Sequence, residues 1–192
     1  FVGLRGDKVY YISTESSPLK RDLYRVGLDG KHKERLTPGD GYYSIYPSAD
    51  LSYYICEGGD SSAPGRTDVF TAGKRVRTLY DNAPLKEALV EAGLPVREFF
   101  TFTTERGDEL NGYMLKPLDF DPAKRYPVLL TQYSGPGSQQ VAEGWGPDWE
   151  DALVTHGYIV VCVDPRGTGY RGEEFKKLTY GNLGRLEVED QI

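Results

Sequence analysis

Two short apolar runs, each followed by a glycine-rich loop, constrain the fold of this chain most. The first run, 128–130 (VLL), leads into the loop 133–140, YSGPGSQQ. The second, 158–163 (YIVVCV), leads into the loop 164–172, DPRGTGYRG, and a helical segment around 149–156 lies between the runs. This order predicts two buried parallel strands of a βαβ unit. Functional groups in such sheets lie at the carboxyl ends of the strands, which here are the two loops.

The first 80 residues have the pattern of short antiparallel strands separated by turn residues. The expected strands are 8–14, 22–28, 33–37, 42–48, 51–57, 68–72 and 75–81. Asp29-Gly30 between two such runs is a strong hairpin signal. The 15 tyrosines also favour β structure. Short strands at this spacing are typical of a sandwich, a barrel or a propeller.

A helix is predicted at 83–92, between the β-rich part and the βαβ unit. Leu85, Ala88, Leu89 and Ala92 form one apolar face at helical spacing. Asn82 is the expected N-cap, and Gly93 with Pro95 ends the helix. A hairpin is then expected from 96–104 and 110–117.

Composition excludes several classes of protein. Hydrophobic residues make up 39% and charged residues 27%, which is typical of a globular chain. A net charge of −6 without a basic cluster argues against nucleic-acid binding, and no apolar run is long enough for a membrane span. Cys56 and Cys162 each lie in a strand pattern and are expected to be buried free thiols. With His32 and His156 distant from both, no metal site is expected.

Several motifs also occur in a recognisable order. They are VYYISTE at 9–15, YYS at 42–44, YPVLL at 126–130, YSGPGSQ at 133–139, DPRGTGYRG at 164–172 and LEVEDQ at 186–191. Together they resemble the bacterial dipeptidyl peptidase IV group of the prolyl oligopeptidase family of serine peptidases. The resemblance implies mixed architecture: antiparallel β structure of partial propeller blades, then an incomplete α/β-hydrolase domain.

The resemblance also implies boundaries. Residues 1–82 would be the C-terminal part of a β-propeller, with the end of one blade and most of the next. Residues 83–95 would be a linker helix, and residues 96–192 the N-terminal part of the peptidase domain. The serine, aspartate and histidine of the catalytic triad would follow Ile192, so the chain is expected to be an inactive fragment. Its cut surfaces are expected to promote self-association.

For the parent protein, the resemblance implies an exopeptidase that releases dipeptides from peptides with N-terminal X-Pro or X-Ala. Acyl transfer to serine followed by hydrolysis requires no cofactor. A homodimer in the periplasm or secreted from a bacterium is expected, with a cytoplasmic location as the alternative. Two other functions remain open: a sister oligopeptidase or acylaminoacyl peptidase, and a non-catalytic binding relative of the same fold.

The resemblance assigns one catalytic role in this chain, to Tyr133. Its hydroxyl would help form the oxyanion hole, where a preorganised donor stabilises the developing negative charge. The alternative is a tyrosine that packs in the core or caps a turn. Arg166 is expected to pair with a nearby acid and to help set this turn.

Other motifs have weaker functional interpretations. The Gly-x-Gly-x-x-Gly pattern at 167–172 suggests a dinucleotide site, but Asp-Pro-Arg precedes it and bulky Tyr170 and Arg171 lie within it. The near-match to a nucleophile elbow at 59–63 lies between two predicted strands, whereas an elbow needs a following helix. Three more expectations concern packing. The helix around 149–156 is expected to turn Trp149, Ala152 and Leu153 inward, and a second helix from 185 is expected to turn Leu186 and Ile192 inward. Trp145 is expected to pack in the core, or else to face the substrate.

Overall fold

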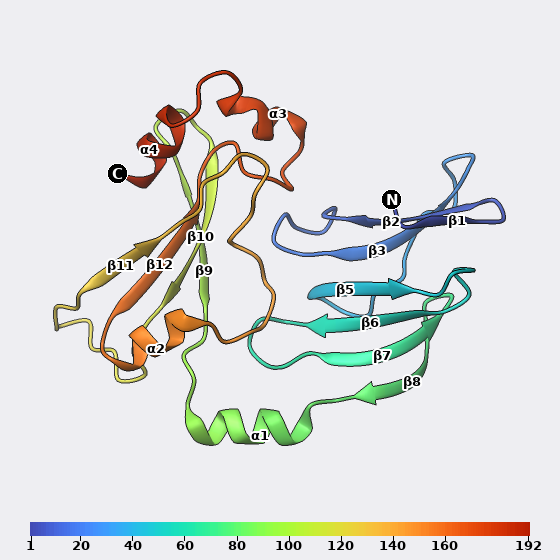
Figure 1. The fold of residues 1–192 in the computed structure, drawn as a ribbon, viewed down its shortest axis with the longest axis horizontal. Helices are drawn as coiled ribbons and strands as arrows, with labels where there is room; N and C mark the ends of the chain where they lie inside the picture. The colour runs from blue at the N-terminus through green and yellow to red at the C-terminus, as the bar shows by residue number, and fades with distance from the viewer. The chain divides into compact units, whose positions relative to one another are not determined.

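The structure is a computed structural model that describes residues 1–192. The chain divides into two compact units (Figure 1). Unit 1 contains Phe1–Glu91 with Glu143–Gly146, and unit 2 contains Ala92–Ala142 with Pro147–Ile192. None of the helices combines the length and apolar character that crossing a membrane requires.

Unit 1 is built from two four-stranded antiparallel meanders, drawn from blue to green in Figure 1. The first contains β1 (Gly3–Arg5), β2 (Lys8–Ser13), β3 (Asp22–Gly27) and β4 (Glu34–Arg35). The second contains β5 (Tyr42–Pro47), β6 (Tyr54–Gly59), β7 (Arg66–Thr71) and β8 (Lys74–Tyr80). All seven predicted strands are present. The expectation of the end of one blade and most of the next was wrong, because β1 is too short to show a sequence pattern and completes the first sheet.

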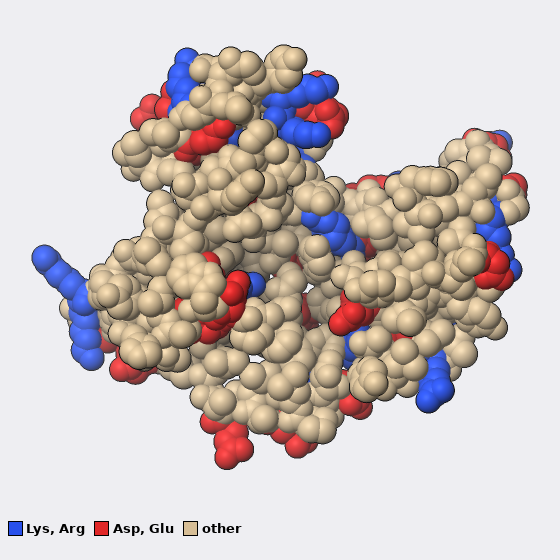
Figure 2. Space-filling view, in the orientation of Figure 1, with Lys and Arg blue, Asp and Glu red and all other residues tan.

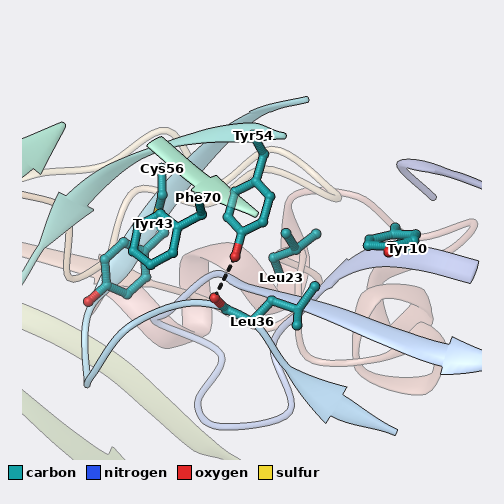
Figure 3. Packing of buried hydrophobic residues seen from close by; sticks show 7 residues of the cluster. All are labelled: Tyr10, Leu23, Leu36, Tyr43, Tyr54, Cys56 and Phe70. Atoms are coloured by element: carbon teal, nitrogen blue, oxygen red, sulfur yellow. Dashed lines mark hydrogen bonds between the residues drawn. The ribbon is translucent and has the colours of Figure 1, made fainter. Parts of the chain in front are cut away.

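A tyrosine-rich core joins the two meanders of unit 1 (Figure 3). Its buried members are Tyr10, Leu23, Leu36, Tyr43, Tyr54, Cys56 and Phe70. The Tyr54 ring stacks on Phe70 with centroids 5.4 Å apart, and its hydroxyl donates to the Leu36 carbonyl at 2.8 Å. The phenol therefore keeps a hydrogen bond while its ring is buried. Cys56 is 3% exposed and is a free thiol, as predicted.

The helix α1 (Ala83–Ala92) has the predicted bounds, but its environment and cap differ from expectation. None of its residues is buried, and Leu85 on the predicted apolar face is 42% exposed. Asn82 occupies the N-cap position, because its carbonyl accepts from the Lys86 N–H at 2.9 Å. Its side chain does not cap the helix and instead donates to the Gly65 carbonyl at 2.6 Å. The Asp81 carboxylate accepts from the Ala83 N–H in its place, at 3.1 Å.

Unit 2 contains a mixed four-stranded sheet in the order β11-β12-β10-β9. Its strands are β9 (Glu98–Thr103), β10 (Glu109–Leu115), β11 (Val128–Thr131) and β12 (Ile159–Asp164). The predicted hairpin is confirmed by the antiparallel β9–β10 pair, and the βαβ unit by the parallel β11–β12 pair. The prediction that both parallel strands are buried was wrong for β11, where Val128 is 61% and Leu130 43% exposed. As an edge strand, β11 has only one neighbour, and these two residues share the face that remains open.

The helices of unit 2 are short. They are α2 (Trp149–Thr155), α3 (Glu173–Lys176), the 3₁₀ turn η1 (Lys177–Thr179) and α4 (Arg185–Gln191). A capping box formed by Asp148 and Asp151 begins α2. The predicted inward face of α2 was wrong for Trp149, which is 55% exposed, and for Ala152, which is also exposed, whereas Leu153 is half-buried. The buried residues of α2 are Glu150 and Val154.

The prediction for α4 was right at one end only. Leu186 is buried, as expected, at 6% exposure. Ile192, the last residue of the sequence, is fully exposed. The inward side of α4 near its end is formed by Asp190 and Gln191 instead.

Candidate functional site

The two glycine-rich loops of unit 2 lie side by side at the carboxyl ends of β11 and β12. The Gly137 N–H donates to the Gly167 carbonyl at 3.0 Å, and the Gly169 N–H donates to the Ser138 carbonyl at 2.7 Å. A β-carbon at Gly169 would be 2.6 Å from the Gly137 carbonyl oxygen. The loops therefore approach at backbone distance, which requires glycine at this position.

Tyr133 lies two residues beyond the end of β11, at the start of the first loop. Its side chain is 69% exposed, which excludes a core-packing role in this chain. Its hydroxyl has no hydrogen-bond partner within the chain. The next residue, Ser134, has φ +57°, and the Tyr133 ring lies against Gly135, where a β-carbon would be 2.4 Å from Cε1. The chain thus presents a free phenol donor on a tight turn at the strand end.

Arg166 anchors the second loop to α4. Its side chain is 4% exposed, and the Asp190 side chain is 1% exposed. The Asp190 carboxylate accepts from the Arg166 backbone N–H at 2.7 Å, from Nε at 2.9 Å and from Nη2 at 2.6 Å. Glu189 and Asp108 lie farther out, at 3.2 Å and 3.5 Å. These bonds to Asp190 raise the pKa of Arg166. The prediction that Arg166 pairs with an acid is confirmed.

Asp164, the last residue of β12, holds the end of the first loop. Its carboxylate accepts from the Gln140 N–H at 2.9 Å and from the Val141 N–H at 2.8 Å. Burial raises the pKa of Asp164, and the two N–H groups offset part of this effect. The carboxylate therefore acts as a fixed acceptor for the loop backbone.

Sequence reasoning missed a polar cluster beneath the sheet, centred on Glu150. This side chain is buried, and it accepts from the Tyr113 hydroxyl at 2.7 Å and from Thr131 Oγ1 at 3.0 Å. The Arg97 guanidinium lies 3.9 Å from the Glu150 carboxylate and 4.9 Å from the centre of the Tyr113 ring. The pKa of Tyr113 is raised mainly by burial of the phenol and, to a smaller extent, by its hydrogen bond to Glu150. The sequence does contain one signal for the burial of Glu150: it lies four residues before Val154, so the two side chains share one face of the helix.

The loop 167–172 has no free phosphate cradle. A β-carbon at Gly167 would be 2.5 Å from Thr179 Oγ1, and Thr168 is 1% exposed, so the first part of the loop is closely packed. The Arg171 guanidinium lies 4.1 Å from the Phe175 ring centroid. The helix that follows has only four residues and begins with two glutamates, which disfavour an anion at its N-terminus.

The remaining sequence candidates lie apart from these loops. The segment 59–63 connects β6 to β7, so the helix of a nucleophile elbow is absent there. His32 is exposed in a turn with φ +56°, and His156 is the C-cap of α2. Trp145 lines a cavity of about 240 Å³ in unit 1 together with Tyr42. Figure 2 shows acidic and basic side chains in mixed groups on one face of the protein.

Two family models match the chain. The model described as the dipeptidyl peptidase IV N-terminal region matches residues 2–64, and the model of the prolyl oligopeptidase family matches residues 145–192. The two matched regions contain strands of unit 1 and the second glycine-rich loop with α4, respectively.

Similar proteins cover all or nearly all of the chain. A probable dipeptidyl-aminopeptidase B of Sclerotinia sclerotiorum is 35% identical over 100% of this chain and 21% of its own length. A probable dipeptidyl peptidase 4 of Emericella nidulans is 37% identical over 96% of this chain and 25% of its own length. The crystal structure of Porphyromonas gingivalis dipeptidyl peptidase 4 has a TM-score of 0.91 and 41% identity, and the match covers 99% of this chain and 27% of that one.

This chain therefore spans about a fifth to a quarter of the length of the curated relatives that it matches. The family models, the relatives and the solved structure agree with the motifs on the two loops. By sequence and by fold, the chain belongs to the prolyl oligopeptidase family, as part of a protein of the dipeptidyl peptidase IV type.

Proposed function

We propose that the full-length protein is a serine exopeptidase that releases dipeptides from N-termini with proline or alanine in second position. The names of the relatives, dipeptidyl peptidase and dipeptidyl-aminopeptidase, support this class of reaction. The observation that carries the proposal is the exposed Tyr133 hydroxyl, held on the turn after β11 without a partner in the chain. Such a donor is available to a substrate.

In this proposal Tyr133 stabilises the oxyanion of the tetrahedral intermediate. A serine attacks the carbonyl carbon of the second residue, and the negative charge that develops on the carbonyl oxygen accepts a hydrogen bond from the phenol. The intermediate collapses as the peptide C–N bond breaks, and the amine of the third residue takes up a proton and leaves. Water then hydrolyses the acyl-enzyme, which releases the dipeptide and restores the serine. Donor groups of this kind contribute roughly 10²–10³-fold to kcat. The reaction requires no cofactor.

The proposal includes the division of the chain. Residues 1–82 would belong to a β-propeller, residues 83–95 to a linker and residues 96–192 to the first part of an α/β-hydrolase domain. The triad serine, aspartate and histidine would follow Ile192. In support, no serine of this chain stands in a Gly-x-Ser-x-Gly sequence. The chain alone is then expected not to hydrolyse Gly-Pro p-nitroanilide.

The experiment compares the wild-type full-length protein with the Tyr133→Phe variant on Gly-Pro and Ala-Pro p-nitroanilides. The variant should lose about 10²-fold or more in kcat and keep its melting temperature. Equal kcat values would show that the Tyr133 hydroxyl does not contribute to the oxyanion hole. An inactive wild type would instead favour a sister oligopeptidase, an acylaminoacyl peptidase or a non-catalytic relative.

Assembly and location are part of the same proposal. The full-length protein would form a homodimer, in the periplasm or outside a bacterial cell, which light scattering and cell fractionation would test. The isolated chain would self-associate through apolar side chains that are exposed in it. Val76 on β8, with 56% exposure, and Val90 on α1, with 84%, support this expectation.

A further inference from the structure

Gln191, the last residue of α4, contacts both β12 and the loop that follows β11. The amide nitrogen of Gln191 donates to the Val163 carbonyl at 3.1 Å, and it also lies 3.4 Å from Ser134 Oγ. The reverse orientation of the amide would place Oε1 against the Val163 carbonyl, so that two acceptors would face each other. The bond to β12 therefore fixes which atom faces Ser134.

The support beneath Gln191 is rigid. Asp190, the preceding residue, forms the buried ion pair with Arg166, and Leu186, one turn earlier, is buried. The end of α4 is thus held by a buried charge pair to the loop that follows β12. A side chain held in this way can define the position of its partner.

Ser134, the partner in the first loop, needs such a support. Its φ of +57° is unfavourable for a residue with a β-carbon, at a cost of roughly 1–2 kcal/mol. The preceding residue, Tyr133, is 69% exposed at this turn. A looser Ser134 would allow the turn to relax and the phenol to move.

We infer that Gln191 is a positioning residue for Tyr133: through Ser134 and Val163, its amide fixes the turn that aims the phenol at the oxyanion. This inference rests on the proposed function. The stabilising contribution of the amide is small, because its Oε1 is buried without a hydrogen-bond partner in the chain. Gln191 is therefore expected to act on geometry more than on stability.

The first test is a double-mutant cycle in the full-length protein, with the variants Gln191→Ala, Tyr133→Phe and the combination. Gln191→Ala should lower kcat for Gly-Pro p-nitroanilide about tenfold, with KM changed less than about twofold. In the Tyr133→Phe background it should cause no further loss. Val188→Ala, on an exposed part of the same helix, is the control and should leave kcat unchanged. Additive losses, or an unchanged kcat for Gln191→Ala, would overturn the inference.

The second test does not require activity. With 3-fluorotyrosine incorporated only at position 133 of the full-length protein, Gln191→Ala should shift and broaden the ¹⁹F resonance, and Val188→Ala should not. An unchanged resonance in Gln191→Ala contradicts the positioning role even in an inactive protein. Absence of dipeptidyl activity in the wild type would contradict the proposed function alone, since the ¹⁹F result still decides whether Gln191 orients Tyr133.

Discussion

The aromatic ring of Tyr133 lies over the backbone of Gly135, where a β-carbon would be 2.4 Å from ring atom Cε1. The backbone conformation does not require glycine there, because φ of Gly135 is not positive. Glycine is required only because the Tyr133 ring occupies the space that a β-carbon would fill. The identity of residue 135 and the direction of the phenol are thus directly linked.

Gly135→Ala should therefore displace the Tyr133 ring. In the full-length protein we expect kcat for Gly-Pro p-nitroanilide to fall at least about tenfold, since a misplaced donor stabilises the oxyanion less. The melting temperature should change little, because the ring is largely exposed. The measurement is steady-state kinetics alongside thermal unfolding.

The chain offers a matched control for this substitution. Gly146 also has no positive φ, and a β-carbon there would meet nothing within 4 Å. Gly146→Ala should leave kcat unchanged. If Gly135→Ala were as active as Gly146→Ala, the ring would be able to relocate without a catalytic effect, and its contact with Gly135 would be unimportant.

A second prediction concerns the ion pair of Arg166 and Asp190. Arg166→Ala should lower the free energy of unfolding by about 3–5 kcal/mol, because it leaves the Asp190 carboxylate buried without its partner. Urea unfolding followed by circular dichroism measures this change. The loss should be the same in this chain and in the full-length protein if the pair acts within unit 2.

Arg106→Ala is the comparison for Arg166→Ala. Arg106 lies 3.3 Å from Glu189, and these side chains are 55% and 39% exposed. Because water screens such a pair, its removal should cost less than about 1 kcal/mol. Equal losses in the two variants would mean that burial of the Asp190 pair does not determine its contribution.

Local patterns in the sequence predicted much of this fold. The bounds of α1, the hairpin of β9 and β10 and the parallel pair of β11 and β12 all follow from periodicity and turn residues within short windows. The position of Tyr133 at a strand end follows from the same patterns. Its exposure and its contact with Gly135 required the structure.

Failures of prediction arose where distant residues determine the environment. Asn82 was expected to cap α1, but the Gly65 carbonyl, 17 positions earlier, binds its side chain. Glu150 was overlooked because its two hydroxyl partners come from β10 and β11. No window around α2 contains both partners, so the buried carboxylate could not be recognised from its own helix.

A third prediction concerns alkaline pH. Burial raises the pKa of the Cys56 thiol from its usual 9.0 to about 12 and that of Cys162 to about 11. Between the unfolded and folded values, the folded state holds more protons than the unfolded state, so the free energy of unfolding falls as pH rises. Each thiol contributes at most about 1.4 kcal/mol per pH unit in that window.

Denaturant unfolding at a series of pH values above 9.0 tests this slope. Cys56→Ala removes one titrating group and should flatten the decline, although the smaller side chain lowers stability at neutral pH. Both thiols should also resist a thiol reagent such as dithionitrobenzoate until the protein is unfolded. A wild-type slope equal to that of Cys56→Ala would show that the Cys56 thiol does not titrate differently in the two states.

The last prediction concerns the turn between β7 and β8. Thr71 pairs with Lys74, so Ala72 and Gly73 form a two-residue hairpin loop, with φ of +46° and +80°. Such loops need a left-handed conformation at both positions, which alanine adopts at a cost. Ala72→Gly should therefore raise the free energy of unfolding by about 1 kcal/mol. The same substitution at Ala88, exposed within α1, should lower it by a similar amount, because glycine weakens a helix. Urea midpoints of the two variants would move in opposite directions, and a loss of stability in both would mean that Ala72 is not strained.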